Sequence, residues 1–372
     1  MMMPTMTDFP RPIQGSYSSE DCLFLLKPIE ANYRTIEDKE KLIQEGRLHY
    51  SELIHKELPP TEQYTRLFLE MTEFYQFRLA KEIMALAKLI AEQRKGEICL
   101  VSLARAGTPI GVLVRRALSV HLERPCHHFS ISIIRDRGID ETALDYLLQV
   151  QRVDPESIVF IDGWTAKGTI TRELKQSIAL YNARRQTTIP DELFVVSDIG
   201  GSADFSATYS DYTIPSSLMN STVSGLISRS ILNSEIGPRD FHGCVSYEHL
   251  FEYDYSDWFI EKIARHLHRN NCAPINPISR LDRQAITRTF IEYIQAEYGI
   301  GDINRIKPGI AESTRVMLRR VPDLLLVKDS RSADVAHLIQ LCTEKNIALL
   351  EHPDMPFEAC AMIKDVIKDS GA

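Results

Sequence analysis

The chain has 372 residues, of which 44% are hydrophobic and 25% charged, so it can bury a sizeable core and has room for about two domains. Its formal net charge of -8 provides no overall attraction to nucleic acid or to an anionic membrane, so such a partner would need a local basic surface. No apolar run is long enough to span a bilayer, and the first residues lack the blocks of a signal peptide; we therefore expect a cytoplasmic protein without a membrane partner.

The cysteines are scattered along the chain and form no CxxC pair. Their odd number, seven, argues against a disulfide framework, and the lack of CxxC pairs argues against a zinc ribbon. We expect most of them to be buried, reduced thiols.

Helical periodicity first appears over residues 61–93, where apolar side chains recur every three or four positions. Short apolar runs then alternate with helical stretches. Strands are expected at 98–103, 129–134, 158–161 and 193–196, and the helices between them end near residues 120, 151 and 181. This alternation is typical of an α/β fold with a mostly parallel, helix-covered sheet.

Beyond Gly200 the periodicity weakens, with a short helix expected at 225–233 and a linker composition at 270–277. The remainder predicts helices at 281–298, 312–320, 333–346 and 357–368, with strands at 324–328 and 348–350. We therefore predict two domains, residues 1–275 and 276–372, of which the second is a smaller α/β unit.

The segment that follows the strand at 158–161 has the composition of a phosphate-binding loop. Asp162 stands at the strand end, and small residues then lead straight into a helix, whose free N–H groups attract phosphate. Asp162 could hold Mg²⁺ directly or through water. The alternative is an ordinary strand–turn–helix junction capped by Asp162. The expected phosphate-binding residues are Gly163, Thr165, Ala166, Lys167, Gly168, Thr169, Ile170 and Thr171.

Three further strand ends carry candidate residues. The strand at 98–103 leads into Ala104, Arg105, Ala106 and Gly107, which form a second anion-binding turn with an arginine. Arg135 and Arg137 follow the next strand and could disperse charge on a leaving group, or be solvated surface residues. Asp198 follows the strand at 193–196 and is a candidate acid/base or base-recognition residue, with structural capping as the alternative.

Together these loops resemble type I phosphoribosyltransferases. The resemblance implies that Asp162 is the first acidic position of the signature loop, that 166–170 cradles a 5′-phosphate, and that the turn at Arg105 grips pyrophosphate. It also implies a ligand such as phosphoribosyl pyrophosphate or a nucleotide, with Mg²⁺ as cofactor. Gly163 and Thr169 depart from the usual pattern, because most members carry a second acid and a glycine or lysine there.

The whole chain resembles a narrower group, bacterial proteins of tellurium-resistance and stress gene clusters. In that group a phosphoribosyltransferase-like domain precedes a Pelota-type, L7Ae-like domain that binds RNA, and members are also labelled StiP-type cysteine proteases. The resembling segments include GSYSSEDCLFLLKPI, FHGCVSYEHLFEYDY and IKPGIAESTRVMLRRVPDLLLVKDS. Basic residues nearly balance acidic ones over 302–372. A basic RNA-binding face, or else a solvated helix face, is predicted from Arg315, Arg319, Arg320, Lys328 and Arg331.

Three functions follow from these patterns. The leading expectation is an enzyme that transfers a phosphoribosyl group to or from a base-like acceptor, mostly by positioning and electrostatics. A non-catalytic sensor of such ligands that acts on RNA is the rival. A cysteine protease ranks last, because His242, Cys244 and His249 form its only suggestive cluster and sequence neighbours are seldom catalytic partners. A homodimer is compatible with the sequence.

Overall fold

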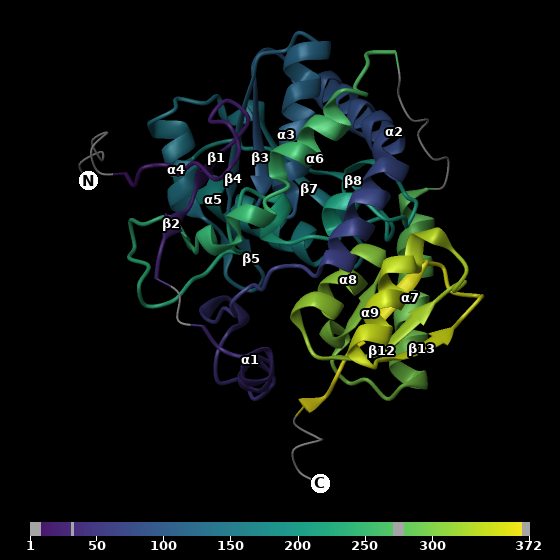
Figure 1. The fold of residues 1–372 in the computed structure, drawn as a ribbon. Helices are drawn as coiled ribbons and strands as arrows, with labels where there is room; N and C mark the ends of the chain where they lie inside the picture. The colour runs from purple at the N-terminus through teal and green to yellow at the C-terminus, as the bar shows by residue number, and fades with distance from the viewer. Residues whose placement is uncertain (1–8, 31–32, 271–278, 367–372) are drawn as a thin grey trace.

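The computed structural model describes residues 9–30, 33–270 and 279–366. Its main sheet has the order β1-β4-β3-β7-β8-β9, with every neighbouring pair parallel (Figure 1). The strands are β1 (Leu23–Leu25), β3 (Ile98–Leu103), β4 (Cys126–Ile131), β7 (Ile158–Thr165), β8 (Leu193–Asp198) and β9 (Phe205–Thr208). The expected parallel α/β architecture is confirmed.

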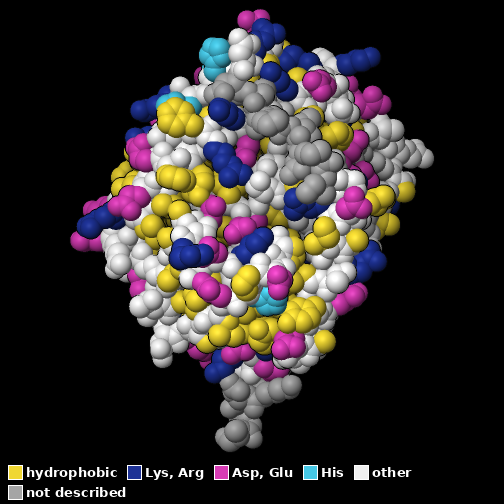
Figure 2. Space-filling view, turned by 90° about the vertical axis from the view of Figure 1, so that its right-hand side faces the viewer, with side chains coloured by type: hydrophobic (Ala, Val, Ile, Leu, Met, Phe, Trp, Pro, Cys, Tyr) yellow, Lys and Arg dark blue, Asp and Glu magenta, His cyan; other side chains and the backbone are white. Residues whose placement is uncertain are grey.

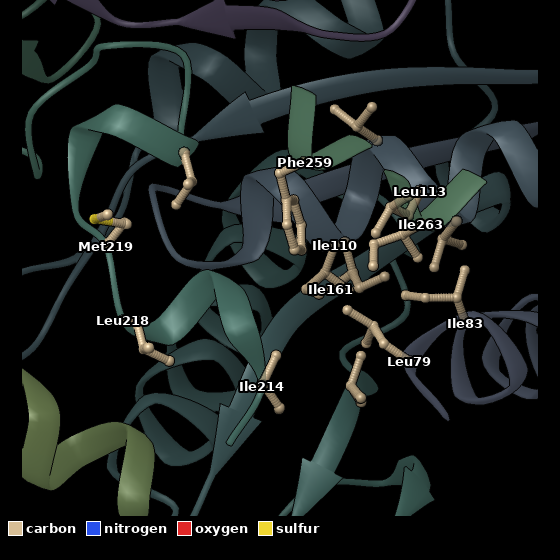
Figure 3. Packing of buried hydrophobic residues seen from close by; sticks show 14 of the residues in the cluster. Leu79, Ile83, Ile110, Leu113, Ile161, Ile214, Leu218, Met219, Phe259 and Ile263 are labelled. Carbon is tan, nitrogen blue, oxygen red and sulfur yellow. The ribbon is translucent and has the colours of Figure 1, made fainter. Parts of the chain in front are cut away.

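Helices cover both faces of this sheet, which is why strand β3 is buried along its whole length. One face packs against α2 (Glu62–Gln93), α3 (Gly107–Arg116) and α6 (Ser256–Ala264), and the other against α4 (Glu141–Gln149) and α5 (Thr169–Arg185). Figure 3 shows side chains of α2, α3 and α6 converging over Ile161 of β7. The helical segment 61–93, expected to form one or two helices, is the single helix α2, and its hydroxyl cap is Thr61, which accepts a hydrogen bond from Tyr64 N.

Shorter elements surround the main sheet. They are α1 (Ile36–Gln44), the parallel pair β2 (Lys27–Pro28) and β10 (Gly243–Cys244), and the hairpin β5 (Ile133–Ile134) and β6 (Gly138–Ile139).

The second domain is a smaller α/β unit, as expected. Its mixed sheet has the order β11-β14-β12-β13, in which β14 is antiparallel to both of its neighbours. The elements are α7 (Arg280–Glu297), β11 (Ile306–Pro308), α8 (Ile310–Arg319), β12 (Pro322–Val327), α9 (Ala336–Lys345), β13 (Ala348–Glu351) and β14 (Ala359–Ile363). Helix α8 lies between this sheet and the first domain (Figure 1).

Buried polar contacts join the two domains. The Asp211 carboxylate accepts hydrogen bonds from Ile310 N at 2.9 Å and Glu358 N at 2.8 Å, so one first-domain side chain caps both α8 and the start of β14. Burial raises the pKa of Asp211 to about 7. Ala166 and Ile199 pack in one apolar cluster with residues of α7 and the second sheet. The domains are thus docked through both polar and apolar surfaces.

Two sequence-based expectations about elements are wrong, and several short elements were missed. Residues 357–368 were expected to form a helix, but 359–363 are strand β14, because antiparallel partners on both sides satisfy its backbone groups. Residues 225–233 form turns and isolated bridges instead of a helix. Strands β1, β9 and β11 and helices α1 and α6 were missed, since short elements carry little periodicity. The predicted domain boundary at 275 lies outside the described residues.

Within the described ranges, no helix is long and apolar enough to cross a membrane.

Candidate functional site

The carboxyl ends of β3 and β7 open toward α8 of the second domain. A cleft of about 700 Å³ lies between the loop after β7 and the second domain. Its lining includes Asp162, the residues 164–170, and charged side chains of the second domain. Parallel sheets bind ligands at this edge. The structure therefore places the predicted loop 162–170 in this cleft, whereas the turn 104–106 lines a neighbouring cavity, and the second domain adds a wall to both.

Asp162 lies at the point where β7 passes the sheet edge. Its Oδ1 accepts a hydrogen bond from Gly163 N at 2.8 Å. Burial raises the pKa of Asp162 to about 6, although the positive charge of Arg315 opposes the shift. The described residues contain no group of three or more His, Cys, Asp or Glu side chains that could hold a metal ion. A Mg²⁺ ion at Asp162 would need ligand oxygens and water for its other positions, and it stays a prediction.

The loop before α5 has part of the expected cradle geometry. Gly168 has φ 68° and stands at the N-cap of α5, a left-handed conformation that glycine adopts without strain. Thr169 begins the helix, and the buried hydroxyl of Thr171 has no partner in the structure. Thr165 Oγ1 lies 3.0 Å from Ser202 Oγ. Backbone donors and an unpartnered hydroxyl thus lie at one helix end.

Lys167 does not extend over this cradle. Its Nζ donates to the carbonyl oxygens of Ile303 and Ile306, both at 2.7 Å, and so ties the loop to the second domain. Burial, together with the nearby charge of Lys307, lowers the pKa of Lys167 to about 7. No sequence pattern indicates this docking role, because the partners of Lys167 are backbone atoms of another domain.

The second predicted turn, 104–107, holds Arg105 in an enclosed position. Arg105 is 6% exposed and forms an ion pair with Glu57, with NH1 at 3.1 Å from Oε2. The same NH1 donates to Ile227 O at 3.0 Å. Arg105 Nε has no partner, although it is buried. One edge of the guanidinium therefore stays available inside the protein.

The remaining predicted site residues of the first domain lie in different places. Arg135 reaches the cleft, where it donates to Asn304 Oδ1 at 3.1 Å, whereas Arg137 pairs with Glu52 at 3.2 Å outside it. Asp198 is 1% exposed and accepts hydrogen bonds from Ser202 N at 2.9 Å and Ala203 N at 2.8 Å. Its carboxylate closes the loop after β8. This arrangement corresponds to structural capping, the alternative role considered for Asp198.

The five basic residues predicted for the second domain do not share one face. Those of α8 turn toward the first domain: Arg319 donates to Asn220 Oδ1 and Arg320 pairs with Glu40. Arg315 pairs with Glu312, whose carboxylate also accepts from Trp164 Nε1 at 3.2 Å. The other two, Lys328 and Arg331, follow β12, and Arg331 pairs with Asp329. On the face shown in Figure 2, Lys and Arg side chains are interspersed with acidic and apolar ones.

Cleft residues outside the predicted loops were missed. They include Lys39, Tyr50, Arg229, Lys307 and Glu312. They come from segments without a recognisable motif, and only the packing of these distant segments brings them together.

The described cysteines are all free and buried: Cys22, Cys99, Cys126, Cys244, Cys342 and Cys360. Burial raises the thiol pKa to about 12 for Cys126, Cys244 and Cys360, and to about 11 for Cys342. Such thiols carry little thiolate at neutral pH. Cys272 lies outside the described residues.

Cys244 lies on β10 with two histidines nearby in sequence. Lys27 N and Ile29 N donate to the carbonyls of His242 and Cys244, so the backbone is extended and both side chains leave on one face. His242 Nδ1 is 2.7 Å from Ser132 Oγ, and His249 Nε2 is 2.9 Å from Glu57 O. Each histidine thus has a partner other than the thiol.

Fold and site together define a two-domain α/β protein whose second domain forms one wall of the cleft. A family model described as "Tellurite-like stress resistance cysteine protease StiP" matches residues 15–264, and a model of the PELOTA RNA binding domain matches residues 285–365. The chain is 40% identical over 369 residues to a protein of Acinetobacter baylyi named "Cysteine protease StiP", with 95% of each chain covered. This chain therefore belongs to the StiP family and carries a C-terminal Pelota domain, which suggests RNA binding.

The expectation of a phosphoribosyltransferase, and with it of a glycosyltransferase-class enzyme, is wrong. The family model and the relative both carry the name of a cysteine protease, the function that the sequence patterns ranked last. The physical reason is that a strand–loop–helix turn for anions recurs on many α/β folds and does not fix a reaction. The same matches overturn the rival expectation of a non-catalytic sensor. The residues predicted to bind phosphate stay predictions.

Proposed function

We propose that the chain is a thiol-dependent peptidase whose Pelota domain binds RNA. The observation that carries the peptidase is the 40% identity over 95% of both chains to a protein named as a cysteine protease. Identity of this extent covers both domains, so the activity would belong to the two-domain unit. The six free cysteines fit a reducing compartment such as the cytoplasm.

Cys244 is our candidate nucleophile. A cysteine peptidase needs a thiolate and a base that later protonates the leaving amine, and the same-face arrangement of His242 and Cys244 supports this pair. In this proposal the structure is the resting enzyme, before substrate binds. Its Cys244 thiol is buried and His242 contacts Ser132. Substrate binding would have to expose the thiol and release the imidazole.

Replacing Cys244 by serine is expected to reduce peptidase turnover at least ~10³-fold, because the serine hydroxyl is not ionised near neutral pH. The measurement is cleavage of a library of internally quenched peptides by the full chain. Cys342→Ser, which alters a buried thiol of the second domain, is the matched control and should retain turnover. Full activity of Cys244→Ser would exclude this nucleophile, and activity of a variant without any cysteine would exclude the peptidase mechanism.

The resting thiol gives a second readout. Without substrate, iodoacetamide should modify Cys244 slowly, with a rate that rises with pH toward the thiol pKa of about 12, because only the thiolate reacts. Addition of a cleavable peptide should accelerate the modification at pH 7. A thiol that reacts fully at pH 7 without peptide would contradict the resting arrangement.

For RNA, the groove between α5 and α7 is our proposed surface. It encloses about 820 Å³ and is lined by more basic than acidic side chains, among which Arg172 and Arg288 are exposed. Neither of these two forms an ion pair within the described residues. Arg172 donates to Lys167 O at 2.9 Å, a neutral partner, so both residues can neutralise phosphates without breaking an ion pair.

Arg172→Ala and Arg288→Ala are each expected to weaken binding of a fluorescein-labelled single-stranded RNA and to reduce the dependence of log K on log salt by about 1. Fluorescence anisotropy of the full chain across a salt series measures both quantities. Arg331→Ala, which removes a charge after β12 that is paired with Asp329, is the control. If Arg331→Ala weakens binding and the groove variants do not, the groove is the wrong surface.

A further inference from the structure

Next to the outer cleft lies a smaller cavity of about 260 Å³, here called the inner cavity, at the meeting point of α1, the turn 104–106, the segment 229–230 and α8. It shares Tyr50, Asp162 and Lys307 with the lining of the outer cleft, so the two spaces are continuous. A solute that enters the cleft can reach the inner cavity. The inner cavity plays no part in the peptidase or RNA proposals.

Basic side chains dominate its wall. Seven Lys or Arg residues line the inner cavity, against the two carboxylates of Asp162 and Glu312. Three of the cations are already paired, Arg105 with Glu57, Arg320 with Glu40 and Arg315 with Glu312. The lining therefore holds more positive charge than its acidic partners neutralise.

Three of the remaining cations have only neutral hydrogen-bond partners. Lys39, which is 4% exposed, contacts His55 Nδ1 at 3.1 Å and donates to Arg319 O at 3.3 Å. Arg229 donates to Tyr50 O at 2.6 Å and to Leu53 O. Arg319 donates to Asn220 Oδ1. Within the described ranges, no carboxylate lies at ion-pair distance from any of the three.

Their proximity is electrostatically unfavourable. Burial and the charges of Arg229, Arg320 and Arg319 lower the pKa of Lys39 to about 7, and burial with the charges of Arg105 and Arg320 among its causes lowers that of Arg229 to about 10. Buried charges without partners are costly. A counter-ion inside the cavity would offset this repulsion.

Two residues of the same lining each have a buried polar atom without a hydrogen-bond partner. Arg105 Nε and Ser230 Oγ have no hydrogen-bond partner, although Arg105 is 6% exposed and Ser230 is 5% exposed. Both residues line the inner cavity. Buried polar atoms are normally satisfied, so these two donors point to an oxygen-bearing ligand.

We propose that the inner cavity binds a compact anion with two or more phosphate groups, held by Lys39, Arg229 and Arg319 and by the free donors of Arg105 and Ser230. Several adjacent cations match several linked anionic groups better than one monovalent ion. The size of the cavity suits an oligophosphate, either free or as the end of a nucleotide. Because Arg319 belongs to α8, the bound anion also holds the Pelota domain against the first domain.

Calorimetric titration of the full chain with inorganic tripolyphosphate tests the site, with pyrophosphate and orthophosphate in parallel. We expect a Kd below about 100 µM for tripolyphosphate and binding at least ~10-fold weaker for orthophosphate, because fewer charge-assisted bonds form. ATP and GTP distinguish the source of the group: affinity similar to that of tripolyphosphate assigns a free oligophosphate, and tighter binding assigns a nucleotide. The proposal fails if none of them binds below 1 mM.

Lys39→Gln and Arg319→Gln should each weaken tripolyphosphate binding by ~10–100-fold, as expected for the loss of a charge-assisted contact. Without ligand, the thermal midpoint of each variant should equal or exceed that of the unaltered chain, because one of several mutually repelling charges is gone. A purely structural role would lower that midpoint instead. Arg331→Gln is the control for charge and should bind normally; unchanged affinity in both cavity variants overturns the proposal.

Discussion

Replacing Glu57 by alanine is expected to lower the free energy of unfolding by about 3–5 kcal/mol, because it leaves the buried Arg105 without its counter-charge. The Glu57 carboxylate contacts Arg105 at 3.1 and 3.3 Å and accepts a hydrogen bond from Ser221 N at 3.1 Å. Glu97→Ala, which removes an exposed partner of His127, should cost less than about 1 kcal/mol. Urea unfolding of the three proteins measures the difference.

Acidification should reduce the loss of stability that Glu57→Ala causes. Burial alone would raise the pKa of Glu57, but Arg105 holds it below its ordinary value of 4.5. A carboxyl with a lowered folded-state pKa stabilises the fold above its unfolded-state pKa, and loses that contribution as the pH falls through the folded-state value. The gap between Glu57→Ala and the unaltered chain should therefore narrow below about pH 4. A loss under 1 kcal/mol at pH 7 would contradict the predicted role.

The double variant Glu57→Met/Arg105→Met shows whether the lost counter-charge or the lost packing causes the destabilisation. It should be more stable than Glu57→Ala alone, because no unpaired charge stays buried. Equal instability of the single and double variants would mean that packing, and not the lost counter-charge, explains the effect.

Gly200→Ala is expected to lower the free energy of unfolding by an amount near or above the upper end of the ~1–3 kcal/mol usual for overpacking. A Cβ at this position would lie 1.8 Å from Ala166 O, so the backbone of one loop must move. Ala166 and Ile199 also pack against the second domain, and the shift should loosen docking as well as lower stability. Urea unfolding and limited proteolysis between the domains report the two effects.

Gly301→Ala provides the comparison, because a Cβ there meets nothing within 4 Å and the residue has no left-handed backbone. It should change stability by no more than about 0.5 kcal/mol. If Gly200→Ala matched this control, the close approach of the loops after β7 and β8 would not constrain the fold.

Arg319 of α8 donates to Asn220 of the first domain. An anion between the domains would favour the docked form by binding it selectively.

The parallel sheet could be predicted from local patterns, because its strands are buried on both faces and read as continuous apolar runs separated by helical stretches. The same patterns also placed Asp162 and Arg105 at one edge, since the carboxyl ends of parallel strands meet there. They failed at β14, where a short apolar run fits either a helix or a strand and only pairing with β11 and β12 decides.

The set of cations that line the inner cavity depends on how distant segments pack together. Lys39, Arg229 and Arg319 come from three distant segments, and no spacing in the sequence connects them. Docking of the second domain also turned Lys167 away from the loop in which it was predicted to bind phosphate. Local patterns reflect backbone geometry and burial, which act over a few residues, whereas the cavity depends on long-range packing between two domains.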